Sequence, residues 1–283
     1  MIDRKLSGDK PSFQLPKGTI DTQMHMYLDG YPAVAGGPGL PPAPLPRPQM
    51  YRQAMGWLGI DRVVITQGNA HQADNDCLLA CLDDMGDAAR GVAVITPETP
   101  DAEIERLGQA GVVGARIMDL PGGAVGLGQL GEIDAMAANA GWLMAVQFDG
   151  SALPEHEAKL TGLKSKWILD HHAKIFAGAT PAHVDVIKRL LDTGNCWFKF
   201  AGCYESSKTG GPDYADIADV ARQIAAYAPE RIIWGTNWPH NQAQKTEDYP
   251  DDAALIDTVL SWFPDDAARQ MALVETPEKL FKF

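Results

Sequence analysis

The chain has 283 residues, of which 45% are hydrophobic and 22% are charged. This composition excludes disordered and fibrous proteins, and the length suits one α/β barrel, which typically takes about 250 residues. The formal net charge of −13 repels phosphate backbones and anionic membrane surfaces. It therefore argues against nucleic-acid and membrane partners, and an anionic small-molecule ligand would need cationic side chains placed close to it.

The start of the chain and its cysteines indicate the compartment. Residues 1–10 are polar and mixed in charge, and no long apolar run follows, so we expect neither a signal peptide nor a membrane span and predict a cytoplasmic protein. The four cysteines show no CxxC pair and no metal-finger spacing, so we interpret them as free thiols. The sequence leaves open whether the chain forms a homo-oligomer.

Eight short β-rich apolar runs recur along the chain, and a longer segment with helical periodicity follows each of them. The runs span residues 19–25, 62–67, 91–96, 113–118, 142–148, 167–171, 196–201 and 231–236. Crossover helices cover the outside of a parallel sheet, and closure of the sheet removes both edges. We therefore predict one (β/α)₈ TIM barrel domain over residues 1–283, with a doubly wound open sheet as the alternative.

Several segments between the strands carry recognisable local signals. Thr99-Pro100-Asp101, Thr180-Pro181 and Pro250-Asp251-Asp252 are typical of helix starts, and we expect Asp251 and Asp252 to cap their helix. The proline-rich stretch 38–48 lies between the first strand and the first helix. We interpret it as a stiff loop at the rim of the barrel, in preference to a partner-binding motif.

Polar side chains gather where the predicted strands end, which is where such barrels build their chemistry. These side chains are Gln23, His25, Asn69, His71, Arg116, Gln147, His171, His172, Lys174, Lys199, Tyr204, Asn237 and His240. A single histidine at a strand end is an ordinary loop residue, but the convergence of so many polar groups predicts a site. Arg116 and Lys199 lie inside apolar runs, where a cation needs a buried partner or a ligand.

Several motifs resemble the amidohydrolase superfamily. They are a first strand that ends in His25, the pair Asp170-His171, Lys199 in the seventh strand, and Trp-Gly-Thr-Asn-Trp-Pro-His at 234–240. Within the superfamily they are similar to the branch of 2-pyrone-4,6-dicarboxylate lactonase. Longer stretches at 20–27, 59–63 and 114–123 resemble the lactone isomerases of that branch, and the resemblance covers essentially the whole chain.

The chain departs from the superfamily pattern at two positions. The usual first strand carries His-x-His for a divalent metal, but Gln23 replaces the first histidine, and a neutral amide is a poor ligand. The eighth strand usually offers an aspartate as base for the attacking water, but here it carries Asn237, whose amide cannot take a proton near neutral pH. The sequence thus predicts no metal, no other cofactor and little hydrolysis.

The resemblance implies isomerisation of a sugar-diacid lactone, from D-galactaro-1,5-lactone to D-galactaro-1,4-lactone, in galacturonate catabolism. His25 and His171 would then carry the proton, without a decision between them, and Asn237 would orient the reacting groups. Arg116 would bind the free carboxylate, helped by Lys199 or Lys174. The substrate hydroxyls or the oxyanion would be hydrogen-bonded by the uncharged groups Gln23, Asn69, Gln147, Tyr204 and Asn237, and His240 is a further candidate for substrate binding.

Three other readings compete with a lactone isomerase. A lactonase would use Arg116, Lys199 and His171 equally well, and a barrel that only binds its ligand is a further option. The third is an oxidoreductase, because Gly126, Gly128 and Gly131 spell GxGxxG, which imitates a dinucleotide-binding fingerprint. Residues 119–125 separate these glycines from the strand, however, so a phosphate would miss the turn between strand and helix.

Overall fold

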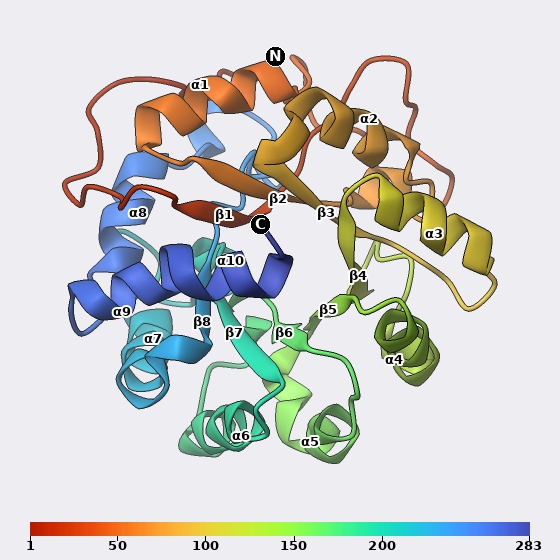
Figure 1. Cartoon of the computed structure of the whole chain (residues 1–283). Coiled ribbons are helices and arrows are strands. Elements are labelled where there is room, and N and C mark those ends of the chain that lie inside the picture. The colour runs from red at the N-terminus through yellow and green to blue at the C-terminus, as the bar shows by residue number, and fades with distance from the viewer.

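The computed structural model describes all residues, 1–283, and shows eight parallel strands in the order β1 to β8 with helices around them (Figure 1). The strands are β1 (Ile20–Met24), β2 (Arg62–Thr66), β3 (Ala89–Ala93), β4 (Val112–Asp119), β5 (Leu143–Phe148), β6 (Trp167–Leu169), β7 (Cys196–Phe200) and β8 (Ile232–Trp234). All eight predicted strands are present, and the fold is a (β/α)₈ barrel. The third strand is shifted from the predicted range 91–96, since it begins at Ala89 and ends at Ala93. It ends there because the side chain of Asn75 binds the backbone N–H and the backbone carbonyl of Val94.

The helices lie between consecutive strands and beyond the last one. They are α1 (Pro48–Leu58), α2 (Asp76–Met85), α3 (Asp101–Gln109), α4 (Leu130–Asn139), α5 (Leu153–Thr161), α6 (Pro181–Asp192), α7 (Ala215–Tyr227), α8 (Asp252–Leu260), α9 (Asp266–Gln270) and α10 (Thr276–Phe281). The predicted start signals precede α3, α6 and α8. None of these helices is both long and apolar enough to cross a membrane.

The barrel closes where β8 returns to β1. The backbone N–H of Asn237 donates to the backbone carbonyl of Gln23 at 2.8 Å, and the backbone N–H of His25 donates to the backbone carbonyl of Trp238 at 2.8 Å. A Cβ on Gly235 would lie 2.5 Å from Cβ of Gln23, so only glycine allows the two chains to approach this closely. Closure therefore sets Gln23, His25 and Asn237, residues from opposite ends of the sequence, side by side.

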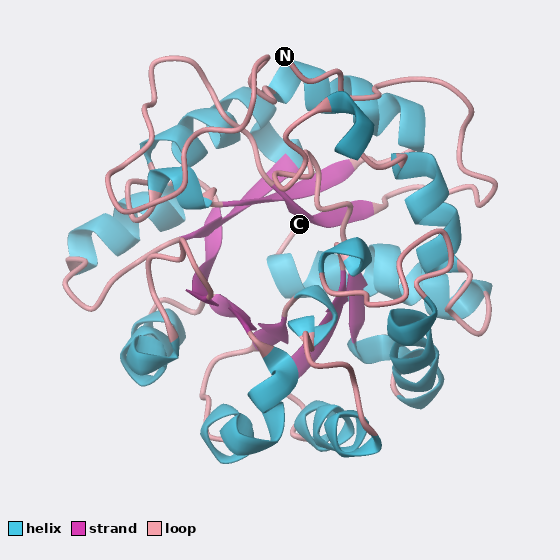
Figure 2. Cartoon of the chain, turned by 180° about the vertical axis from the view of Figure 1, so that it is seen from behind, coloured by secondary structure: helices cyan, strands magenta, loops and turns pink.

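The barrel interior changes from apolar to polar along the strands. Its lower part is filled by a cluster that includes Val64, Ala145 and Ile168, and by Leu280 and Phe281 from α10, which lies across that opening in Figure 1. Because side chains alternate in a strand, the next inward positions are two residues further on. These positions carry Thr66, Gln147 and Asp170, and Lys199 follows Trp197 in the same way. The polar layer thus lies at the carboxyl ends of the strands, where loops surround the opposite opening (Figure 2).

Candidate active site

His25 presents one free ring nitrogen to a cavity at the barrel mouth. Its Nδ1 lies 2.8 Å from the carbonyl oxygen of Thr66, which can only accept, so Nδ1 carries the proton and Nε2 keeps its lone pair. Burial, helped by the nearby cation of Arg116, lowers the pKa of His25 to about 3. The imidazole is therefore neutral at physiological pH and able to accept a proton.

The mouth cavity has a volume of about 270 Å³ and is lined by His25, Tyr27, Asn69, Asn241 and the loop from Pro38 to Pro41. This loop belongs to the proline-rich stretch expected at the rim. The Asn241 Nδ2 donates to the hydroxyl of Tyr27 at 2.9 Å, while its buried Oδ1 has no partner. The wall of the cavity is thus rich in uncharged hydrogen-bonding groups, which suit a ligand with several hydroxyls.

Lys199 fills the centre of the polar layer. Its ammonium lies 2.8 Å from Oε1 of Gln23 and 2.8 Å from Oδ1 of Asp170, and both side chains of this ion pair are at most 1% exposed. Burial lowers the pKa of Lys199, an effect that the carboxylate of Asp170 opposes. The pair therefore places one fixed positive charge within hydrogen-bonding distance of Gln23.

The donor set around Lys199 does not fit the divalent metal that the superfamily pattern implies. The ammonium already occupies the space between Gln23 and Asp170, and a second cation there would face it without screening. No three or more His, Cys, Asp or Glu side chains are grouped so that they could hold a metal ion.

Arg116 is a buried cation held only by neutral acceptors. Its Nη1 donates to the carbonyl of Gln67 and to Oδ1 of Asn69, and its Nη2 donates to Oε1 of Gln147, all at 2.9 Å. Burial lowers the pKa of the guanidinium, and its Nε has no partner. A desolvated guanidinium with free N–H groups and no paired carboxylate has the chemistry to bind an anion.

A left-handed turn after β6 places His171 and Lys174. Residues 171–174 all have positive φ, between 45° and 62°, a conformation that costs free energy for residues other than glycine. Lys174 donates to Oε2 of Glu205, and Nδ1 of His171 lies 3.5 Å from the same oxygen. Burial lowers the pKa of His171 well below its usual range, which keeps the ring neutral although Glu205 opposes the effect.

Glu205 is a site residue that the sequence did not reveal. It follows Tyr204 in the short helical turn η6 (Cys203–Glu205). Burial raises its pKa, but the cation of Lys174 and the hydrogen bonds from Lys174 and Asn237 lower the pKa by more. The net effect keeps a carboxylate at the barrel mouth. Nothing in the pattern around it distinguishes this glutamate from a surface residue, because only the turn after β7 directs it inward.

A hydrogen-bonded chain leads from Asn237 to a second buried carboxylate. Asn237 Nδ2 donates to the Tyr204 hydroxyl at 2.8 Å and to Oε1 of Glu205 at 3.0 Å. The Tyr204 hydroxyl lies 2.6 Å from Nδ1 of His240, whose Nε2 lies 2.8 Å from Oδ1 of Asp252. His240 therefore has no free nitrogen for a substrate, and we revise its predicted role from substrate binding to support of Tyr204.

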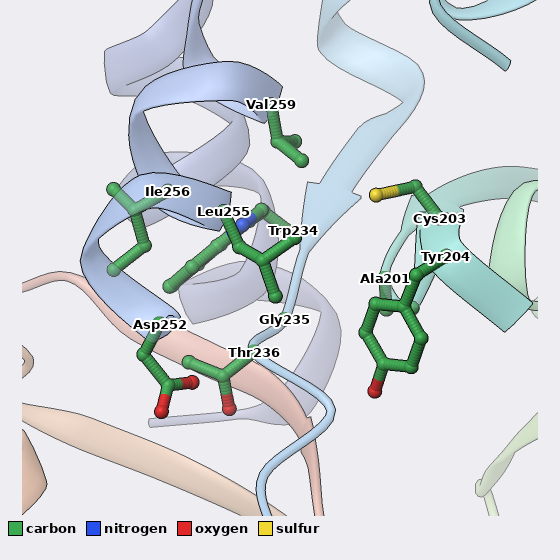
Figure 3. A pocket seen from close by; sticks show the side chains of 11 residues that line it. Ala201, Cys203, Tyr204, Trp234, Gly235, Thr236, Asp252, Leu255, Ile256 and Val259 are labelled. Carbon is green, nitrogen blue, oxygen red and sulfur yellow. The ribbon is translucent and has the colours of Figure 1, made fainter. Parts of the chain in front are cut away.

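Asp252 differs from its expected role as a helix cap. Asp251 does cap α8, since its side chain accepts from two backbone amides, whereas the Asp252 carboxylate is 1% exposed and binds His240 and Tyr249. Asp252 and Tyr204 line a small cavity of about 20 Å³ (Figure 3). This space is enough for about one water molecule, so the side chains of Tyr204 and Asp252 are closely packed where they face this cavity.

Comparison with known proteins identifies the family. The Amidohydrolase family matches residues 20–283. The chain belongs to the amidohydrolase family. This amidohydrolase is 57% identical over 281 residues to the D-galactarolactone isomerase of Agrobacterium fabrum, which covers 99% of the chain and 96% of that protein. An apo crystal structure of an Agrobacterium tumefaciens protein superposes with a TM-score of 0.96 at 56% identity and covers 99% of each chain.

More distant relatives of this amidohydrolase are named as hydrolases. A 2-pyrone-4,6-dicarboxylate hydrolase of Comamonas testosteroni is 29% identical over 99% of the chain and 95% of its own length. A 4-sulfomuconolactone hydrolase of Rhizobium radiobacter is 28% identical over 95% of the chain and 92% of its own length. The amidohydrolase thus shares its full length both with an isomerase and with hydrolases of lactones.

Proposed function

We propose that the chain is a lactone isomerase that converts D-galactaro-1,5-lactone to D-galactaro-1,4-lactone, as part of galacturonate catabolism. The observation that carries this proposal is that residue 237, after strand eight, is an asparagine and not an aspartate. Its amide cannot take a proton from water. Isomerisation needs no water, since the attacking hydroxyl belongs to the substrate. The high identity to a D-galactarolactone isomerase supports the same conclusion.

The proposed reaction is an intramolecular acyl transfer. The substrate 4-hydroxyl oxygen attacks C1, and its proton passes to Nε2 of His25 as the tetrahedral oxyanion forms. The C1–O5 bond then breaks, and the proton is returned to O5, so that one imidazole serves as base and acid in turn. Because the nucleophile and the electrophile are tethered, orientation and electrostatics supply most of the acceleration.

Cationic and neutral side chains bind the substrate carboxylate, stabilise the oxyanion and balance the charge of Glu205. We assign the free N–H groups of Arg116 to the C6 carboxylate of the substrate, since a guanidinium binds a carboxylate in a bidentate manner. Lys199 supplies the positive charge that stabilises the oxyanion, and His171 is a second ring that can hold a proton. Lys174 neutralises Glu205 and so prevents its charge from repelling the substrate.

Product analysis tests the proposal. Purified protein is incubated with D-galactaro-1,5-lactone, and ¹³C NMR is compared with an enzyme-free sample to correct for spontaneous isomerisation. We expect the 1,4-lactone to accumulate without free galactarate, at a rate that exhaustive chelation leaves unchanged. Free galactarate as the main product would instead favour a lactonase, the function of the more distant relatives.

A substitution at His25 links the activity to the site. His25→Asn retains a donor for the carbonyl of Thr66 but lacks a basic nitrogen. We expect kcat to fall by at least about 100-fold, the usual contribution of a general base. The control is His156→Asn on α5, where the ring of His156 packs on Phe148 and no catalytic role is assigned.

A further inference from the structure

The hydrogen-bonded chain from Asp252 to Asn237 has only one consistent direction. A carboxylate without a proton can only accept, so Asp252 requires Nε2 of His240 to carry the proton. Nδ1 of His240 is then the acceptor, and the Tyr204 hydroxyl must donate to it at 2.6 Å. The lone pairs of Tyr204 are consequently left to accept from Nδ2 of Asn237 at 2.8 Å.

Glu205 fixes the same orientation from the other side. Its Oε1 accepts the second amide proton of Asn237 at 3.0 Å, so both N–H groups of this amide are used inside the protein. Oδ1 of Asn237 has no partner. The backbone bonds between Asn237 and Gln23 and between Trp238 and His25 keep this amide in the same layer as the base. The strand-eight amide can therefore offer an acceptor to a ligand, but no donor.

We propose that Asp252, acting through His240 and Tyr204, is a positioning residue that holds Asn237 as the hydrogen-bond acceptor for a hydroxyl of the substrate that does not react. This inference rests on the proposed isomerase function. Asn237 Oδ1 holds this hydroxyl and so orients the ring, which leaves the 4-hydroxyl free to give its one proton to His25. The amide takes no part in binding the oxyanion, because both of its N–H groups are used inside the protein. Of the two partners that the sequence leaves open for Asn237, a substrate hydroxyl or the oxyanion, only the hydroxyl can donate to Oδ1.

A positioning role for Asp252 differs from a purely structural one because it sets the tautomer of His240. Asp252 has two partners, His240 and the hydroxyl of Tyr249 at 3.3 Å. The bond to His240 connects Asp252 to Tyr204 and Asn237, whereas the bond to Tyr249 is not part of this connection. Asp252→Asn preserves shape but can donate to Nε2 of His240, which moves the ring proton to Nδ1. Nδ1–H of His240 then competes with Nδ2 of Asn237 for the Tyr204 oxygen, so the side-chain amide of Asn237 is held less firmly.

The test compares Asp252→Asn with Tyr249→Phe as a matched control. ¹⁵N NMR of selectively labelled histidine, assigned with a His240→Gln variant, reports the tautomer of His240 without any substrate. We expect Nε2–H in the wild type and in Tyr249→Phe, and Nδ1–H in Asp252→Asn. With the lactone, we expect Asp252→Asn to lower kcat by about 100-fold with KM changed less than about threefold, whereas Tyr249→Phe changes both by less than about threefold.

Each outcome of the test decides a separate question. An unchanged tautomer or an unchanged kcat in Asp252→Asn overturns the positioning role. A wild type that shows the expected Nε2–H tautomer but isomerises no lactone overturns the proposed function instead, because the tautomer measurement needs no substrate. If Asp252→Asn does not fold, Tyr204→Phe replaces it, since it breaks the chain at a partly exposed side chain and is expected to show the same kcat loss.

Discussion

Replacing Arg116 by methionine tests how the site recognises a carboxylate. A guanidinium has five N–H groups, and three of those of Arg116 donate to Gln67, Asn69 and Gln147. Two remain for the substrate. A hydrogen bond to a charged group contributes about 1.5–3 kcal/mol, so the loss of both should cost about 3–6 kcal/mol of transition-state binding. This free energy corresponds to a fall in kcat/KM of about 10²–10⁴.

The stability of the Arg116→Met variant should change much less than its kinetics. The substitution leaves three acceptors without their donor, at about 1–3 kcal/mol each, but it also removes a buried and unpaired cation whose desolvation costs several kcal/mol. These effects oppose each other. We expect the melting temperature to shift by less than about 6 °C, which corresponds to about 2 kcal/mol.

Steady-state kinetics with two substrates separate recognition from folding. D-galactono-1,5-lactone has a hydroxymethyl group in place of the carboxylate, so the wild type and Arg116→Met should turn it over at similar kcat/KM. The control, Arg106→Met, removes exposed pairs with Glu103 and Asp76 and should match the wild type on both lactones. An equal loss on both substrates, together with a melting temperature lowered by more than 10 °C, would refute the carboxylate role of Arg116.

Three further predictions address other parts of the site. Asn237→Asp places a carboxylate beside Glu205, so we expect slower isomerisation and some galactarate in the NMR product analysis; an unchanged product ratio would contradict the role of the amide. Gly202→Ala puts a Cβ 2.8 Å from Nδ2 of Asn237 at a φ of +59°, so kcat and the melting temperature should both fall, and normal kcat would count against the close packing. His172 is buried against Phe200 with a pKa lowered to about 3, so the unfolded chain binds its proton first and stability is lost as pH falls from 6.5 toward 3. By urea denaturation, His172→Phe should therefore reduce the loss of stability between pH 7.5 and 5 by on the order of 2 kcal/mol, and parallel pH curves would disprove this.

The sequence predicted the barrel and the cationic part of the site because both follow from strand periodicity. Arg116 and Gln147 come from adjacent strands, and a position near the carboxyl end of a parallel strand is enough to bring them to one opening. The eight strands and the helix starts were recognisable for the same reason. In these segments the periodicity and the helix-start residues match the strands and helices of the structure.

The acidic support of the site could not be predicted, because it depends on irregular backbone. Glu205 and Asp252 reach the site from a short turn and from the first turn of a helix. The left-handed turn at 171–174 and the irregular pairing between Asp21 and Met24 redirect side chains that simple alternation would place elsewhere. Such deviations are held by tertiary contacts and leave no periodic signal.

The helix α10 supplies the floor of the barrel with the last residues of the chain. Leu280 and Phe281 fill the interior below the polar layer, and Phe283 places its ring near the guanidinium groups of Arg62 and Arg90. The apolar interior at this opening is therefore exposed to water whenever α10 is not docked, so the stability of the barrel depends on the attachment of this one helix.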